Sequence, residues 1–348
     1  MTGPSLRSRV LGCFLGGAVG DALGAPVEFL SLPEILSRYG PAGVSGYVED
    51  GGVGRFTDDT QMTLFTAEGL LRARAAGLGP DQSVEAVHRA YLRWLGTQDQ
   101  TPGEGWLESQ PLLARRRAPG NTCLSALRTG RMGTPELPLN DSFGCGGVMR
   151  VAPVGFVGAE VFDLGCRVAA VTHGHPAGYL SAGVLAQIVA ELTRGVGLEE
   201  ATTAAADRLH QHAAAELVVE ALGRALEAAD TRPPTPEVVE ALGGGWYGHD
   251  ALAISVFCAL AADDFAHGVC LAVNHSGDSD STGSITGQIL GTLLGVESIP
   301  RPWLDGLEGR ALIEQVAADF ANTFVDGLPP DPTRYPPDPS RRRAGQTG

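Results

Sequence analysis

The chain has 348 residues, of which 43% are hydrophobic and only 19% are charged, so it can bury a large core. Its 25 basic and 40 acidic residues give a formal net charge of −15, which disfavours nonspecific binding to nucleic acid or to an anionic membrane. The six cysteines form no CxxC pattern. This is typical of reduced, mostly buried thiols rather than a disulfide framework, and it shows no paired-cysteine zinc motif.

The first predicted element is a helix that ends at Glu28 and carries a glycine at every fourth position. These glycines are Gly12, Gly16, Gly20 and Gly24. Glycine costs a helix about 1 kcal/mol relative to alanine, so four on one face need a packing reason, such as the close approach of another backbone. The apolar run Val10–Val19 imitates a signal sequence, but Asp21 breaks it and it is too short to span a bilayer. We therefore expect a soluble, cytoplasmic protein.

Helical spacing of apolar residues continues through most of the chain, and sustained period-two alternation is scarce. The further predicted helices cover Thr60–Ala76, Val84–Leu95, Val161–Val171, Gly178–Thr193, Glu199–Leu209, Ala215–Ala229, Leu252–Ala261, Phe265–Val273, Ser284–Gly295 and Leu307–Phe324. There is no repeat of solenoid length and no obvious linker. The sequence predicts one compact all-α domain over residues 1–326, followed by a disordered tail rich in proline and arginine over residues 327–348.

Two acidic clusters precede helical segments and lie about two hundred residues apart. They are Thr57-Asp58-Asp59-Thr60 and Asp278-Ser279-Asp280-Ser281-Thr282. Oxygen ligands at this density favour magnesium, manganese or calcium over zinc or copper. Each cluster alone also fits ordinary helix capping. A second glycine-spaced run, Gly283, Gly287, Gly291 and Gly295, suggests that the fold brings the two clusters together.

Three segments between the clusters offer possible ligand contacts. Residues 142–150, SFGCGGVMR, predict a glycine-rich turn that runs into a helix, whose amides either hold a diphosphate or form a plain turn. His173 and His175 are either capping residues or ligand contacts. Trp246-Tyr247 either line a ligand site or plug the core, and we favour the core. Nothing near Cys145 supplies the base that a thiol nucleophile needs.

Five motifs, in this order, resemble the ADP-ribosylglycohydrolase family. They are GDALGAPVEF at 20–29, FTDDTQMTL at 56–64, SFGCGGVMRVAPVG at 142–155, THGHP at 172–176 and SGDSDSTGSITGQILG at 276–291. The resemblance covers about residues 8–325. It implies a single compact orthogonal helical bundle with a dinuclear site for two divalent cations, Mg²⁺ or Mn²⁺. It also implies a hydrolase that releases free ADP-ribose from a modified side chain. Arginine is favoured, because GDALGAPVEF resembles the arginine-directed bacterial branch.

The resemblance also implies a role for each matching position. The implied metal ligands are Thr57, Asp58, Asp59, Asp278, Asp280 and Ser281, where the family more often has threonine at the last position. Glu28 and Asp59 form the implied catalytic set, with Glu28 near the reacting carbon, although from residues alone Glu28 is a surface residue at a helix end. The implied substrate contacts are Ser142, Phe143, Gly144, Cys145, Gly146, Gly147, His173 and Asn121.

Several alternatives stay open at this point. The substrate could carry serine-linked or poly-ADP-ribose, or be an ADP-ribosylated small molecule. A noncatalytic ADP-ribose-binding or structural relative is a second class, but retention of Glu28 and every ligand position argues against it. A metal-dependent phosphohydrolase is a third class, and it would release phosphate instead of ADP-ribose. We expect no nucleic-acid or membrane partner and, given the acidic charge and lack of a coiled coil, a monomer.

Overall fold

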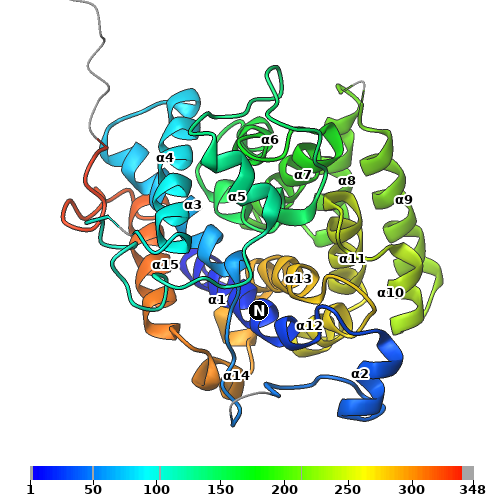
Figure 1. Ribbon diagram of the computed structural model, residues 1–348. Helices are drawn as coiled ribbons and strands as arrows, with labels where there is room; N and C mark the ends of the chain where they lie inside the picture. Colours follow the sequence, from blue (N-terminus) through cyan, green and yellow to red (C-terminus); the bar gives the residue numbers. More distant parts are fainter. Residues whose placement is uncertain (1–2, 49–50, 102, 213, 339–348) are drawn as a thin grey trace, which may run out of the picture.

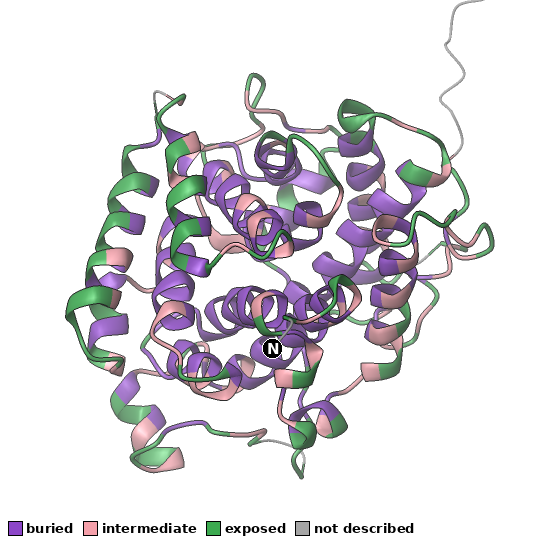
Figure 2. Ribbon diagram, turned by 180° about the vertical axis from the view of Figure 1, so that it is seen from behind, coloured by how far each residue is buried: buried purple, intermediate pink, exposed green. Residues whose placement is uncertain are grey.

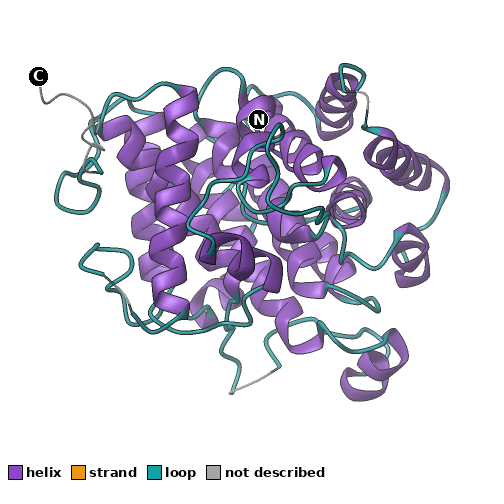
Figure 3. Cartoon of the chain, turned by 45° about the horizontal axis from the view of Figure 1, so that its top comes forward, coloured by secondary structure: helices purple, strands orange, loops and turns teal. Residues whose placement is uncertain are grey.

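The computed structural model describes residues 3–48, 51–101, 103–212 and 214–338 (Figure 1). Over these residues the regular structure is helical, and Figure 3 shows helices joined by loops without a strand. Extended pairing within the described ranges is limited to two isolated bridges, Gly54 with Leu307 and Gly144 with Tyr247. The predicted all-α class is therefore confirmed.

The helices follow one another along the whole described chain. They are α1 (Leu6–Gly24), η1 (Ala25–Val27), α2 (Leu32–Tyr39), α3 (Asp58–Ala75), α4 (Pro80–Gln98), α5 (Asn121–Arg128), η2 (Cys145–Gly147), η3 (Ala152–Phe156), α6 (Val161–Ala170), α7 (Pro176–Thr193), α8 (Leu198–Leu209), α9 (Glu216–Thr231), α10 (Pro236–Leu242), α11 (Gly248–Leu260), α12 (Phe265–Val273), α13 (Ser279–Leu294), η4 (Val296–Ser298), α14 (Arg301–Gly306) and α15 (Arg310–Phe324). The sequence missed α2, α5, α10 and α14, which have eight residues or fewer. Such short helices show too few turns for a periodic pattern to stand out.

The centre of the molecule is the antiparallel pair α1 and α13, which lie against each other in the middle of Figure 1. Their glycine faces meet backbone to backbone. The touching pairs, with the distance from an added Cβ of the first residue to the carbonyl oxygen of the second, are Gly12 and Gly291 (2.1 Å), Gly16 and Gly287 (2.3 Å), Gly20 and Gly283 (1.9 Å), and Gly24 and Ser279 (2.1 Å). No side chain fits between these helices, so the predicted reason for the glycine spacing is confirmed.

The other helices form a shell around this pair. α12 and α11 pack on α13, and α15 packs on α1, while α3 with α4 and α6 with α7 form neighbouring pairs. Figure 2 shows buried residues through the middle of the molecule and exposed residues on the outward faces of the peripheral helices. This arrangement buries α1 on all sides. The segment Leu6–Val27 is long and apolar enough to cross a membrane by length and composition, but 83% of its apolar window is buried inside the protein.

The described part of the predicted tail is packed against the helices. Tyr335 has no exposed surface, and its hydroxyl donates a hydrogen bond to Asp319 in α15 (3.0 Å). Asp338 forms ion pairs with Arg89 and Arg93 of α4, each at 2.9 Å. The expectation of disorder therefore does not hold for residues 327–338, and residues 339–348 lie outside the described chain. Local composition could not reveal these contacts, because the partners are distant in sequence.

Candidate metal centre and active site

The antiparallel pairing of α1 and α13 brings the two halves of the site together. The C-terminal end of α1 leads through η1 to Glu28, and the N-terminal end of α13 carries Asp278 and Asp280. One carboxylate oxygen of each of these three residues lies within 4.8 Å of the others. Residues separated by about 250 positions thus form one acidic group because two smooth helices run in opposite directions.

A further buried carboxylate, Asp21, fixes the start of α3 against α1. It accepts hydrogen bonds from the amide of Thr57 (2.9 Å), the amide of Thr60 (3.0 Å) and the hydroxyl of Thr60 (2.6 Å). The next residues of α3, Asp58 and Asp59, consequently face the same space as Glu28. Sequence reasoning missed this role of Asp21. The available signal was a carboxylate inside an otherwise apolar, glycine-spaced helix.

These groups line a cavity of about 240 Å³, here called the acidic pocket. Its lining includes Glu28, Asp58, Asp59, Asp278, Asp280, Ser281, Ala118, Gly120, Asn121, Thr122, Cys123, Gly144, Cys145, Gly146, Met149, His173 and Trp246. Asp58 accepts a hydrogen bond from the amide of Gly120 (3.2 Å), which ties the loop before α5 to the start of α3. Every acidic residue predicted for the metal site or for catalysis therefore lies in one pocket.

The negatively charged forms of the carboxyl groups in the acidic pocket are unfavourable unless a positive charge is bound. Burial, followed by repulsion from Asp280, raises the pKa of Glu28 to about 8. Burial and the charge of Asp280 likewise raise the pKa of Asp21 to about 7. The pKa values of Asp58 and Asp59 lie well above the usual range, chiefly because both side chains are buried. Full ionisation of so many close carboxylates needs a compensating cation.

The donor set fits divalent cations that prefer oxygen ligands. Asp59 Oδ1 is buried and has no hydrogen-bond partner, so one lone pair in the pocket is left unsatisfied. The hydroxyl of Ser281, a carboxylate-rich wall and raised carboxyl pKa values are the surroundings that Mg²⁺ or Mn²⁺ would stabilise. Thr57 differs from the other implied ligands, because its hydroxyl accepts a bond from the amide of Asp59 (3.3 Å) and caps α3.

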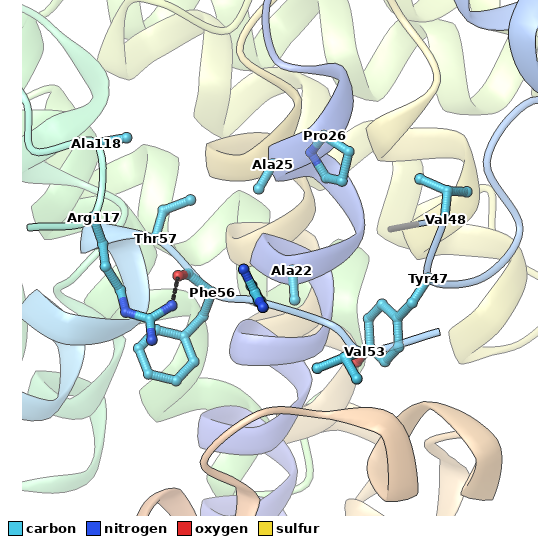
Figure 4. Close-up of a pocket in the computed structure, with 11 residues that line it drawn as sticks. Ala22, Ala25, Pro26, Tyr47, Val48, Val53, Phe56, Thr57, Arg117 and Ala118 are labelled. Atoms are coloured by element: carbon cyan, nitrogen blue, oxygen red, sulfur yellow. Dashed lines mark hydrogen bonds between the residues drawn. The ribbon is translucent and has the colours of Figure 1, made fainter. Parts of the chain in front are cut away.

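Thr57 lies instead in a second cavity of about 340 Å³, which shares Ala118 with the acidic pocket. Figure 4 shows Arg117 in this cavity with its guanidinium group over the ring of Phe56, at 4.5 Å from the ring centre. The guanidinium group also donates to the carbonyl of Phe56 (3.1 Å) and pairs with Glu308 (2.8 Å). The positive charge of Arg117 is therefore balanced away from the carboxylates.

The implied substrate-binding residues divide into two groups. Gly144, Cys145, Gly146, His173 and Asn121 line the acidic pocket, whereas Ser142, Phe143 and Gly147 are not part of its lining. The ring of Phe143 packs on Tyr247, with 4.6 Å between ring centres, and on His175 at 4.9 Å. Ser142 and Phe143 support the pocket through their backbones, since their carbonyls accept bonds from the amides of His175 and Gly248.

The predicted helix after the glycine-rich turn is wrong. Cys145–Gly147 form a single 3₁₀ turn, and the amide of Cys145 donates to the carbonyl of Trp246 (3.0 Å), so it is not available to an anion. Among the segments named for substrate binding, the one that places an α-helix N-terminus at the pocket is α5, which begins at Asn121. The sequence did not reveal α5, because a helix of eight residues leaves little periodicity.

His173 is held by a buried arginine. Arg150 has no exposed surface, donates to the hydroxyl of Thr172 (2.6 Å) and lies over the ring of Tyr91. The same hydroxyl lies 2.9 Å from His173 Nδ1. Burial, and secondarily the positive charge of Arg150, lowers the pKa of His173 to about 3. His173 is therefore a neutral group at the pocket wall, and His175 caps α7 by accepting from the amide of Ala177.

Trp246 and Tyr247 are not core residues, contrary to the favoured expectation. Their exposed fractions are 41% and 48%, and Trp246 lines the acidic pocket. Trp246 also stacks on Phe29, the residue after Glu28, with 5.6 Å between ring centres. Phe29 itself is 77% exposed. Two aromatic faces thus stand at the mouth of the pocket, where a ligand ring can reach them.

The site therefore combines a carboxylate-rich centre with a helix N-terminus and aromatic rims. A sequence model of the ADP-ribosylglycohydrolase family matches residues 2–328. The chain belongs to the ADP-ribosylglycohydrolase family. The family resemblance that the five motifs indicated is thereby confirmed, and with it the assignment to enzymes that hydrolyse glycosidic bonds.

Similarity to individual ADP-ribosylglycohydrolases extends over most of the chain. This chain is 29% identical over 340 residues to ADP-ribosyl-(dinitrogen reductase) glycohydrolase of Rhodospirillum rubrum. The alignment covers 94% of this chain and 100% of that protein. The chain is 24% identical over 319 residues to ADP-ribosylarginine hydrolase Tri1 of Serratia proteamaculans, covering 89% and 78%. A solved structure titled ADP-ribosylglycohydrolase-related protein complex superposes with a TM-score of 0.66 at 28% identity, covering 90% of this chain and 96% of the other.

Proposed function

We propose that this protein is a divalent-cation-dependent hydrolase that releases free ADP-ribose from ADP-ribosylated arginine. The observation that carries the proposal is the meeting of Glu28, Asp278 and Asp280 within 4.8 Å in a pocket that Asp58 and Asp59 also line. Such a group has no structural use, because its mutual repulsion destabilises the fold unless a cation binds.

Each wall of the pocket has a role in this proposal. Two divalent cations, Mg²⁺ or Mn²⁺, held by Asp58, Asp59, Asp278, Asp280 and Ser281, would supply positive charge that orients the ribose hydroxyls and a water molecule. Glu28 stands beside these ligands. Its carboxylate can stabilise the positive charge that develops on the ribose carbon as the glycosidic bond breaks, and it can exchange a proton with the attacking water.

The part of the pocket formed by the start of α5 suits the diphosphate of ADP-ribose. The first turn of α5 faces the pocket at Asn121 and Thr122, where free backbone amides and the positive end of the helix dipole favour an anion. Gly146 keeps this wall open, since an added Cβ would lie 3.0 Å from the ring of His173 and 3.1 Å from the sulfur of Cys123. An acidic protein can hold a polyanion here because the cations and these amides offset the carboxylates.

Arginine as the acceptor is supported by similarity to a protein named for ADP-ribosylarginine, at 24% identity over 89% of this chain. The test is a panel of peptides that carry ADP-ribose on arginine or on serine, incubated with the purified protein and Mn²⁺. Chromatography then measures free ADP-ribose and phosphate. Faster release from the arginine peptide is expected, and exclusive release from the serine peptide would contradict the arginine assignment.

Glu28→Gln tests the catalytic role in the same assay. Removal of the carboxylate should lower the turnover rate by at least about 100-fold, the usual contribution of a positioned acid or base, with a much smaller change in the Kd for ADP-ribose. Glu220→Gln, on the exposed face of α9, is the matched control and should turn over like the wild type. Phosphate as the product would favour a phosphohydrolase. Tight ADP-ribose binding without any product would favour a noncatalytic relative.

A further inference from the structure

Two sulfur atoms lie among the oxygen ligands of the acidic pocket. The sulfur of Cys145 lies 2.8 Å from Oδ2 of Asp278. The hydroxyl of Ser281 lies 3.6 Å from the same sulfur and 3.9 Å from the thioether sulfur of Met149. One hydroxyl proton cannot be donated to both sulfurs at once. A thiol, a thioether, a carboxylate and a hydroxyl thus lie close together in the lining of the acidic pocket.

The described lining of the pocket around this group includes no lysine or arginine. Cys145 is half-buried and Met149 is buried, and both line the pocket. Independently of the sulfurs, Asp59, which lines the same pocket, has a buried Oδ1 without a hydrogen-bond partner. Cys123, the other cysteine of the lining, does have a positive charge beside it. Its sulfur lies 3.4 Å from the guanidinium group of Arg150, which repels a second cation.

We propose that Cys145 is a sulfur ligand for a thiophilic divalent cation, Zn²⁺ or Cd²⁺, which it binds together with Asp278 in the acidic pocket. Thiolate and thioether donors select such cations, whereas Mg²⁺ and Mn²⁺ prefer oxygen. On binding, the S–H bond breaks, the proton leaves to solvent, and the electron pair that stays on sulfur forms the bond to the cation.

The consequence for the enzyme is inhibition, and this part rests on the proposed hydrolase function. A cation bound to Cys145 and Asp278 occupies ligands that the hard cations need. Zn²⁺ and Mn²⁺ therefore compete for Asp278, and inhibition by Zn²⁺ depends on the thiol of Cys145. Cation binding itself does not depend on the hydrolase activity, so the two claims can be tested separately.

The test is a titration of the metal-free protein with Co²⁺, which gives a thiolate-to-metal absorption band in the near ultraviolet only when sulfur is a ligand. The wild type should show the band, and Cys145→Ser and Cys145→Ala should lose it. Cys270→Ser, a partly buried cysteine of α12 outside the pocket lining, should keep it. Competition with a chromogenic chelator should show Zn²⁺ affinity reduced at least about tenfold in Cys145→Ser, and a smaller change for Mn²⁺.

A wild-type titration without the band overturns the proposal, and so does a band that persists in both Cys145 variants. A tenfold loss of Mn²⁺ affinity equal to that of Zn²⁺ would also overturn it, because the thiol would then not select for soft cations. Circular dichroism of each variant checks that the fold is retained. These measurements use no ADP-ribosylated substrate. They therefore test cation binding by Cys145 even if the protein is not an ADP-ribose hydrolase.

Discussion

Replacement of Gly287 by alanine should destabilise the protein although alanine is the better helix former. An added Cβ would lie 2.0 Å from the carbonyl oxygen and 2.5 Å from the carbonyl carbon of Gly16, whereas real Cβ contacts below 3.0 Å essentially do not occur. Both atoms belong to the backbone of α1, so the helices must separate by roughly 1 Å. Overpacking of this kind costs about 3 kcal/mol. Helix propensity returns about 1 kcal/mol, which leaves a net loss of about 2 kcal/mol.

The matched control is Gly223→Ala in α9, where no atom lies within 4 Å of the added Cβ. The same substitution there should raise the free energy of unfolding by about 1 kcal/mol. Urea unfolding followed by circular dichroism measures both variants. Calorimetry with Mn²⁺ should also show weaker binding to Gly287→Ala, because α13 carries Asp278 and Asp280 at its start. If both variants are equally stable, the close backbone contact is not what the glycines serve.

Two further predictions concern stability. Tyr335→Ala should lower the free energy of unfolding by about 3 kcal/mol because it empties a buried site, whereas Leu328→Ala, at a side chain that is 53% exposed, should change it little. Folded Asp21 holds its proton up to about pH 7 and folded Glu28 up to about pH 8, whereas the unfolded chain has already released both, so the cation-free protein should lose stability as pH rises to about pH 8. Mn²⁺ should therefore raise the Tm more at about pH 8 than at about pH 6.5, and Glu28→Gln should reduce this difference.

Each of these two stability predictions has an outcome that would contradict it. Equal stability of Tyr335→Ala and Leu328→Ala would mean that the segment after α15 does not contribute to the fold. A Tm that is flat or rising with pH in the metal-free protein would mean that the fold does not raise the pKa values of Glu28 and Asp21. Titration of His173 does not interfere, because its lowered pKa removes stability only below about pH 6.5.

The sequence predicted the features whose cause is local. Gly283 and its neighbours at four-residue spacing mark a helix face that must touch another backbone, and this pattern was readable without a partner. The role of Asp21 could not be predicted from the sequence. Asp21 accepts hydrogen bonds from the amides of Thr57 and Thr60, and these bonds depend on how α3 packs against α1. Tyr335 was hidden for a similar reason, since Pro-rich surroundings suggested disorder and its partner Asp319 lies in another element.

The pocket walls show the same division. The two acidic clusters were predicted by residue type to form one site, and the structure brings them together in one pocket. The turn at Cys145 was misread because glycine followed by apolar residues resembles a helix start. In the fold the amide of Cys145 is instead bound by the carbonyl of Trp246. That contact also places Trp246 at the pocket, which no local pattern could indicate, because the two segments are about a hundred residues apart.

The most direct test of the account is metal-dependent release of ADP-ribose. Purified protein is incubated with an ADP-ribosylated arginine peptide and Mg²⁺ or Mn²⁺, beside a sample with EDTA and a sample of Asp58→Asn, which removes one charge from the acidic pocket. We expect free ADP-ribose in the first sample and its loss in both controls. Release that continues undiminished in EDTA and in Asp58→Asn would contradict the claim that this pocket holds the catalytic cations.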